Sequence, residues 1–413
     1  MPRSEEIIVI GAGIVGLCCA RWLQRDGHRV RLLERERPGA GASSGNAGVF
    51  AVDSVLPLAI PATIRALPGM LLDPLGPATV HWPSLPGLLP WLGRFLANSR
   101  PSRVESCARS LADLCSQARE GFTPLTAGRP AASLLRDTGW LTVFETGAAL
   151  ERAQSGIAAR RRLGVRAETL TASELRELAP ALTPGLAGGV LYPDCWMCSD
   201  PAGLVDALAD DFRADGGVVE QAEVDALAPD GDGVRLEERH SRRRARAVVV
   251  AAGAHSRPLA ASLGDRIPLA AERGYHLMLP RPQLRLPLPV MSGEHAFVAT
   301  PMAGGLRLAG TSELGGLDRP PAWRRAEHLG SLGRGLLPGL ALDNATRWMG
   351  YRPTLPDSLP VIGPSPRCQR VIYAFGHQHL GLTLAGITGR LVADVLAHRT
   401  WRLDPNAVAP GRF

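Results

Sequence analysis

The sequence of 413 residues contains no lysine, and all 46 of its basic residues are arginine. This absence excludes a catalytic lysine that forms a Schiff base and the lysine of a P-loop phosphate site. The formal net charge is +7, but the arginines are scattered and the only dense run is Arg242–Arg246, beside an expected strand. Binding of nucleic acid is therefore not predicted.

The sequence also lacks long apolar runs and a second cysteine pair that could complete a zinc site. No stretch of about 20 uninterrupted apolar residues occurs, so we expect no transmembrane helix, and the first residues lead into a strand without the apolar segment of a signal peptide. Among seven cysteines, Cys195 and Cys198 form an isolated pair, which favours packing over a metal site. An odd cysteine count fits reduced thiols and a cytoplasmic location.

The chain shows strand–helix signals at its start, middle and end. A strand over Ile7–Ile10, a glycine turn, a helix over Leu17–Gln24 and a strand over Val30–Glu34 form one βαβ unit. The pattern recurs in the middle of the chain and near its end, where the strand Val371–Ala374 precedes a helix that ends near Leu396. Helical and antiparallel signals fill the intervals.

The first motif with chemical meaning is Gly11-Ala12-Gly13-Ile14-Val15-Gly16. Gly11 permits the tight turn, Gly13 lets a pyrophosphate approach the backbone, and Gly16 lets helix and strand pack closely. The helix N-terminus then attracts the phosphates. Glu34 ends the next strand, where a carboxylate accepts hydrogen bonds from ribose hydroxyls and repels a 2′-phosphate, which indicates FAD or NAD rather than NADP.

Small residues favour FAD over NAD. The loop Ser43-Ser44-Gly45-Asn46-Ala47-Gly48 follows the acidic strand end and Arg35 closely, and suits close contact with a flavin dinucleotide. An apolar strand ends at Ala251-Ala252-Gly253, which also allows close approach. Near the C-terminus, a glycine turn from Gly376 opens a helix, whose N-terminus would stabilise reduced anionic flavin.

At these residues the chain resembles the D-amino-acid oxidase superfamily of FAD-dependent oxidoreductases, and most closely its bacterial D-amino-acid dehydrogenase branch. The resemblance covers nearly the whole chain and includes Gly274-Tyr275 and Gly350-Tyr351-Arg352-Pro353. The segment Gly376–Ala385 and Thr300-Pro301-Met302 are similar to members that oxidise D-proline or cis-4-hydroxy-D-proline.

The resemblance implies an α/β fold of two domains, each assembled from separated segments. A Rossmann-type FAD-binding domain is expected over residues 1–80, 190–268 and 345–413, and an antiparallel-sheet substrate domain over residues 81–189 and 269–344. The residues expected to contact the cofactor are Gly11, Gly13, Ile14, Val15, Gly16, Glu34, Arg35, Ser43, Ser44, Asn46, Ala47, Gly48, Val224, Ala252, Gly253, Gly350, Gly376, His379, Leu380, Gly381, Leu382 and Thr383.

The resemblance also implies an arginine that holds the substrate carboxylate, and Arg352 occupies the matching position. A planar guanidinium holds a carboxylate by two parallel bonds; the structural alternative is pairing with an acid such as Asp357. Relatives often carry a second arginine where this chain has Met302. The expected catalytic-site residues are Arg352, His377, His379, Tyr275 and Tyr351. Either histidine could accept a proton or line the flavin, and either tyrosine could bound the substrate or only pack.

The implied reaction is oxidation of a D-amino acid to the imine, by hydride transfer to flavin N5. Related sarcosine oxidases use a lysine to activate oxygen, so its absence favours a dehydrogenase that passes electrons to a quinone or carrier. The alternatives are a glycine- or sarcosine-type oxidase that forms hydrogen peroxide, and a flavin-holding subunit of a larger assembly. Positions 346–352 lack cysteine and positions 38–50 lack histidine, which favours noncovalent FAD.

Residues 55–98 combine many prolines with large apolar side chains. They are expected either to face the core of the second domain or to form an exposed surface that contacts a membrane. In the second case the protein would lie on the inner face of the plasma membrane. The large apolar residues in this stretch are Leu71, Leu72, Trp82, Leu88, Leu89, Trp91, Leu92 and Phe95.

Overall fold

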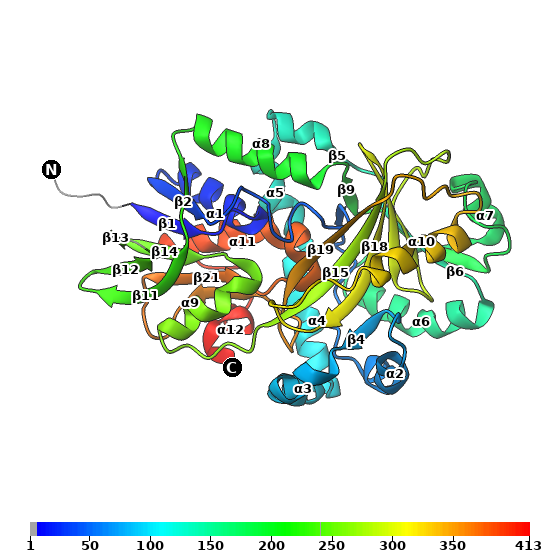
Figure 1. Ribbon diagram of the computed structural model, residues 1–413, viewed down its shortest axis with the longest axis horizontal. Helices are drawn as coiled ribbons and strands as arrows, with labels where there is room; N and C mark the ends of the chain where they lie inside the picture. The colour runs from blue at the N-terminus through cyan, green and yellow to red at the C-terminus, as the bar shows by residue number, and fades with distance from the viewer. Residues whose placement is uncertain (1–5, 240) are drawn as a thin grey trace.

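The computed structural model describes residues 6–239 and 241–413, except for the side chains at positions 66–68 and 70–72. Figure 1 shows two sheets side by side, with helices packed around each. The first sheet has the strand order β10 (Val218–Gln221), β2 (Val30–Glu34), β1 (Ile7–Ile10), β14 (Ala247–Val250), β21 (Val371–Phe375) and β20 (Val361–Pro364). All pairs are parallel except β20 with β21.

Both faces of this first sheet are covered, as the short apolar strands require. One face packs against α1 (Ile14–Arg25), α8 (Pro201–Ala214) and α11 (Gly381–Leu396). The other packs against α9 (Ser256–Ser262) and a small sheet of β11 (Val224–Asp230), β12 (Gly233–Glu238) and β13 (Arg242–Ala245). The predicted βαβ unit and the Rossmann-type part of the fold are confirmed.

The second sheet has nine strands. Its order is β19 (Thr346–Thr354), β15 (Ala270–Leu279), β18 (Gly305–Leu314), β17 (Phe297–Met302), β16 (Val290–Ser292), β6 (Trp140–Phe144), β8 (Gly188–Tyr192) and β7 (Glu168–Thr171), with β4 (Ala78–Val80) paired to β18. Most pairs are antiparallel, as predicted, but β16 with β6 and β18 with β4 are parallel. A leucine-rich face packs against α7 (Ala172–Leu178) and α10 (Arg324–Leu336).

Several further elements pack around the two sheets. They are β3 (Val49–Phe50), β5 (Leu135–Arg136) and β9 (Trp196–Cys198), which form a three-stranded sheet, and the helices α4 (Pro101–Ser116), α5 (Ala118–Thr126), α6 (Gly147–Arg162) and α12 (Pro405–Val408).

Sheet membership differs from the predicted domain ranges at four elements, of which β4, expected in the first domain, pairs with β18 of the second sheet. β8 and β19 belong to the second sheet, although the segments 190–268 and 345–413 were assigned to the first domain. α5, expected in the second domain, packs against α1 and α11, and Trp22 Nε1 donates to Gly121 O at 2.9 Å. The reason is physical: an amphipathic helix or short strand carries no local mark of which sheet it joins.

One helical stretch, Gln378–Leu396, is long and apolar enough to cross a membrane. In this fold, 67% of its most apolar window is buried inside the protein. Its position between α1 and α5 is that of a core helix.

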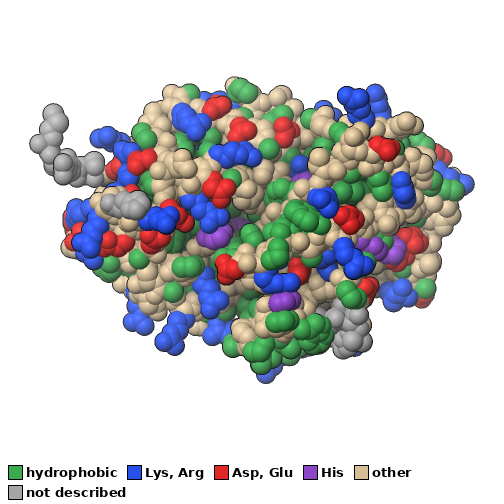
Figure 2. Space-filling model, viewed as in Figure 1, with side chains coloured by type: hydrophobic (Ala, Val, Ile, Leu, Met, Phe, Trp, Pro, Cys, Tyr) green, Lys and Arg blue, Asp and Glu red, His purple; other side chains and the backbone are tan. Residues whose placement is uncertain are grey.

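The proline-rich stretch contains α2 (Pro61–Leu72), a turn over Trp82–Ser84 and α3 (Leu85–Asn98). Trp91 and Phe95 are buried and stack at 5.2 Å between ring centroids, so this side faces the core. The other side of the stretch leaves Trp82 58%, Leu89 57% and Leu96 48% exposed. Figure 2 shows hydrophobic side chains gathered around α3. The predicted residues Leu71 and Leu72 have side chains outside the described part of the structure.

Candidate functional site

The opening glycine turn has the geometry of a phosphate cradle. Gly11 has a φ of +102°, and a Cβ on Gly16 would lie 1.9 Å from Gly11 O, so both positions require glycine. Ala12 N donates to Glu34 Oε2 at 2.7 Å. Glu34 is thereby fixed beside the turn, where the sequence places the ribose.

Other predicted contact residues surround the same turn. Ile14 N donates to Ser43 Oγ at 2.9 Å, which joins the loop 43–48 to the start of α1. Gly253 has a φ of +56° and no atom within 4 Å of its Cβ position, which leaves room for a ligand. The Arg35 guanidinium lies 3.1–3.3 Å from the His255 ring nitrogens.

The predicted contacts of Val224 and Ala252 with the cofactor stay predictions. Both side chains are partly buried and pack against the core of the first sheet. The first sheet nevertheless brings them near the strand end of Glu34, whose carbonyl accepts a hydrogen bond from Ala222 N at 2.9 Å.

The second sheet presents one face to the loop 43–48. Thr300 Oγ1 donates to Ala47 O at 2.8 Å, and Arg307 Nη1 donates to Asn46 O at 2.6 Å and to Ser44 O at 3.3 Å. Within the loop, Gly48 N donates to Asn46 Oδ1 at 2.7 Å. The loop predicted to hold the flavin is therefore tied by its carbonyls to β17 and β18.

An aromatic stack supports the same loop. The rings of His276 and Trp348 lie 4.9 Å apart and nearly parallel, and His276 Nδ1 is 2.9 Å from Gly45 O. A Cβ at Gly45 or Gly350 would come within 2.2 Å of the Trp348 ring. Gly350, predicted to contact the cofactor, instead makes room for this indole.

The C-terminal glycine turn places its histidines in different surroundings. Gly376 has a φ of +87°, and His377 points into the protein, 2.9 Å from Thr388 Oγ1. Burial lowers the pKa of His377 to about 3. Of the two roles left open for His377, a buried and neutral imidazole bonded to Thr388 does not fit a proton acceptor; that it lines the flavin stays a prediction.

His379 faces the second sheet. Its side chain is exposed, yet desolvation lowers its pKa to about 4, with Glu272 raising and Arg352 lowering it. At the adjoining start of α11, Leu380 and Leu382 are buried, a Cβ on Gly381 would lie 3.9 Å from His377 Cβ, and Thr383 Oγ1 accepts from Ala51 N at 3.0 Å.

Arg352 is anchored through one nitrogen. Its Nη1 donates to Glu272 Oε1 at 2.7 Å, to Thr311 O at 3.2 Å and to Ser312 Oγ at 3.2 Å. The guanidinium lies over Gly274, where a Cβ would be 2.5 Å from its Cζ. Within the described residues no hydrogen bond is made by Nε or Nη2, so that edge can take a carboxylate.

Arg352 pairs with an acidic side chain, as the structural alternative held, but that residue is Glu272 and not Asp357. Asp357 accepts from Arg412 Nε at 2.7 Å, and the partner of Arg352 is Glu272, opposite it in the β15–β19 register. Ser312 Oγ and Thr354 Oγ1 also donate to this buried carboxylate, at 2.6 and 2.9 Å. Arg352, Glu272 and His379 therefore form one cluster.

The two tyrosines point to the opposite face of the sheet, because alternate residues of a strand point to opposite sides. Tyr275 donates to Glu313 Oε2 at 2.6 Å, and Tyr351 donates to Leu317 O at 2.6 Å. Of the two alternatives left open for these tyrosines, the contacts fit packing: Tyr275 bonds to Glu313 within β18, and Tyr351 bonds to Leu317 after it.

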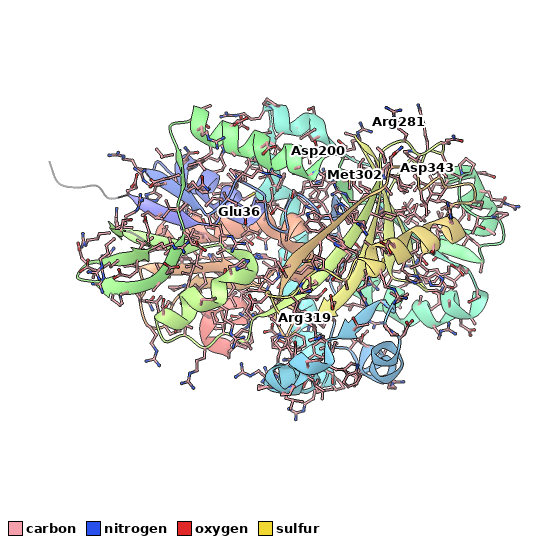
Figure 3. All side chains as sticks on the ribbon, viewed as in Figure 1. Glu36, Asp200, Arg281, Met302, Arg319 and Asp343 are labelled. Carbon is pink, nitrogen blue, oxygen red and sulfur yellow. The ribbon has the colours of Figure 1, made fainter. Side chains whose placement is uncertain are left out.

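Metal chemistry has no candidate ligands here. Among residues 6–239 and 241–413, no group of three or more histidine, cysteine or acidic side chains could hold a metal. Cys195 and Cys198 are buried free thiols, and Cys195 Sγ lies 3.5 Å from Asp53 Oδ1. Met302, labelled in Figure 3 near Asp200, lies against Gly48.

Buried neutral histidines predict sensitivity to acid. Burial lowers the pKa of His276 to about 4, and that of His377 to about 3. As the pH falls below about 6.5, the unfolded chain binds protons that the native state does not, so each histidine removes up to about 1.4 kcal/mol of stability per pH unit. The midpoint of thermal unfolding should fall between pH 6.5 and 5. His377→Gln should lessen this dependence; an unchanged slope would contradict the assignment.

The chain has been compared with known proteins. Residues 6–395 match the profile of a family described as FAD dependent oxidoreductase. A D-amino-acid oxidase of Bradyrhizobium diazoefficiens is 36% identical over 421 residues and all of both chains. A D-amino acid dehydrogenase of Paramagnetospirillum magneticum is 32% identical over 424 residues and 99% of both chains.

Solved structures share the fold. Glycine oxidase from Geobacillus kaustophilus superposes with a TM-score of 0.75 at 24% identity, over 99% of this chain and 100% of that one. An L-alpha-glycerophosphate oxidase from Mycoplasma pneumoniae, solved with FAD bound, gives a TM-score of 0.72 at 18% identity, over 98% and 97%. The glycine turn and the fixed Glu34 fit the dinucleotide of FAD.

Proposed function

The chain belongs to the family of FAD-dependent oxidoreductases, and we propose that it oxidises a D-amino acid to the corresponding imine. One observation carries this proposal: Arg352 is anchored through Nη1 and keeps a free edge beside His379, at the opening of the flavin-facing helix α11. Two similar relatives named for D-amino acids support the substrate class. Bound FAD supplies the two-electron acceptor.

The residues of the cluster have separate tasks in this proposal. The free Nε–Nη2 edge of Arg352 binds the substrate carboxylate by two parallel bonds, which fixes the position of Cα. Glu272 keeps the guanidinium in place. His379 has its pKa lowered to about 4, so it is neutral at pH 7 and lines the site as a hydrogen-bonding group.

The test is anaerobic mixing of the yellow protein with a panel of D- and L-amino acids. Loss of the oxidised-flavin absorbance with D-amino acids, and not with their L-enantiomers, is the expected result. A protein that keeps FAD but is bleached by no amino acid would favour the alternative of a flavin-holding subunit.

We propose further that the enzyme is a dehydrogenase with noncovalent FAD and a quinone or carrier as acceptor. The absence of lysine supports this, since it removes the oxygen-activating group of sarcosine oxidases. D-Proline and cis-4-hydroxy-D-proline are the proposed substrates, on the resemblance at Gly376–Ala385 and Thr300–Met302. Peroxide formed in step with turnover would favour a glycine- or sarcosine-type oxidase instead. Release of FAD by acid precipitation tests the noncovalent attachment.

We also propose a cytoplasmic protein that contacts the inner face of the plasma membrane through α3. Trp82, Leu89 and Leu96 are exposed there, and the exposed Arg100 and Arg103 follow, which suits anionic lipid. Trp82→Gln with Leu89→Gln should reduce co-sedimentation with vesicles that contain phosphatidylserine at least about threefold. Equal sedimentation of variant and parent, or none by either, would refute this contact.

A further inference from the structure

Arg307 is a half-buried cation for which the described residues supply no carboxylate partner. Its Nη1 is used by two loop carbonyls, Ser44 O and Asn46 O, and its Nε is buried without a hydrogen-bond partner. No acidic side chain in the described residues lies within ion-pair distance of it; Asp200 acts on it only at longer range. Burial accordingly lowers the pKa of Arg307 to about 10, so at neutral pH it still carries its charge.

Such a charge is costly unless something balances it. Among the other buried arginines, Arg21 pairs with Asp215 and Arg273 lies 3.9 Å from Glu313. Arg325 has no acidic partner in the described residues and donates instead to Pro74 O, Gly76 O and Ser312 O. Arg307 lies instead under the loop predicted to hold the flavin. A negative charge that develops on the bound cofactor would be the natural counter-ion for it.

Arg307 does not serve the substrate carboxylate. In the register of the sheet it lies opposite Met278 of β15, whereas Arg352 lies opposite Glu272. Met278 and Glu272 are six residues apart on β15, which corresponds to ~20 Å along the strand. The stacked rings of His276 and Trp348 lie between these two positions. The guanidinium groups of Arg307 and Arg352 therefore cannot bind the same carboxylate. This holds although Arg307 lies on the strand next to Met302, the position where relatives often carry a second arginine.

We propose that Arg307 is a positioning residue that fixes the loop 43–48 and, by its uncompensated charge, favours the reduced anionic form of the bound flavin. The proposal rests on family membership and on the placement of the flavin beside this loop. It does not rest on the proposed substrate. A low local dielectric makes the charge effective over several ångströms.

The experiment is a reductive titration of the purified holoprotein with a chemical reductant and a reference dye, which uses no amino acid. Arg307→Gln keeps a donor for Asn46 O but removes the charge. It should weaken binding of reduced relative to oxidised FAD at least about tenfold, equivalent to a midpoint about 30 mV lower. Arg307→Lys keeps the charge and should stay within about threefold of the parent.

Three further variants separate charge from structure. Arg347→Gln removes an exposed arginine of the same sheet that pairs with Glu327, and Thr300→Val removes a loop anchor without changing charge; neither should shift the midpoint. Asp200→Asn keeps the cap of α8 on Gly203 N but removes the acidic charge that acts on Arg307, so the midpoint should rise. If Arg307→Gln fails to bind FAD, the midpoint of Asp200→Asn still tests whether the charge of Arg307 acts on the flavin.

An unchanged midpoint in Arg307→Gln, an equal shift in Thr300→Val or Arg347→Gln, or no rise in Asp200→Asn would overturn the proposal. A failure to bleach with amino acids would leave it intact, because that outcome concerns only the substrate.

Discussion

Replacing Arg352 with alanine should lower kcat/KM at least about tenfold while the protein stays yellow. A charge-assisted hydrogen bond is worth about 1.5–3 kcal/mol, and here the bond would also fix Cα. FAD should remain bound because Arg352 lies in β19 and none of its hydrogen bonds reaches the glycine turn or the loop 43–48. Stopped-flow reduction and steady-state kinetics measure the loss.

The same change has a second consequence, since it leaves Glu272 without its cation. Breaking a buried ion pair costs about 3–5 kcal/mol, although Ser312 and Thr354 still donate to this carboxylate. Arg352→Ala should therefore also unfold at a lower temperature. Adding Glu272→Gln should recover part of the stability and none of the activity.

Arg352→Lys separates the two effects. A lysine can neutralise Glu272, but it cannot offer two parallel bonds to a carboxylate as well. We expect near-parental stability with kcat/KM still reduced. Near-normal turnover of either folded, FAD-loaded variant would remove Arg352 from the carboxylate-binding role.

The cofactor half of the site follows from local sequence. β1 and β2 have the predicted bounds, because short apolar strands end at glycine turns or charged residues. Two contacts of the first turn are local, since a Cβ on Gly16 would meet Gly11 O and Ala12 N donates to Glu34, whereas a Cβ on Gly11 would meet the distant Ala251 O. Contacts between residues close in sequence fix the spacing of the glycines and of Glu34, and this spacing can be recognised in a single sequence.

The substrate half depends on strand register, which local sequence does not contain. Glu272 meets Arg352 only because β15 and β19 pair in one register, and a shift by one residue would turn Tyr351 to this face instead. For the same reason, the contacts of His276, Trp348 and Arg307 with the loop 43–48 could not be predicted from the sequence. A charged residue in an otherwise apolar strand was the one available signal for Glu272 and Arg307.

Gly16→Ala should abolish stable FAD binding. The added Cβ would lie 1.9 Å from Gly11 O and 3.4 Å from Ala251 Cβ, so α1 must move away from the turn. Gly11 N donates to Leu33 O at 2.8 Å, so displacement of Gly11 disturbs β2 as well. Overpacking of this kind costs about 1–3 kcal/mol, and since the phosphates bind at the displaced turn, we expect roughly a hundredfold loss of affinity.

A matched control makes the same chemical change elsewhere. Gly335 also lies in a helix, α10, and a Cβ there meets no atom within 4 Å. Gly335→Ala should bind FAD normally and gain up to about 1 kcal/mol of stability from helix propensity. Quenching of FAD fluorescence on titration into apoprotein measures both affinities. A Gly16→Ala protein that binds FAD within threefold of the Gly335→Ala protein would show that the phosphates do not lie on this turn.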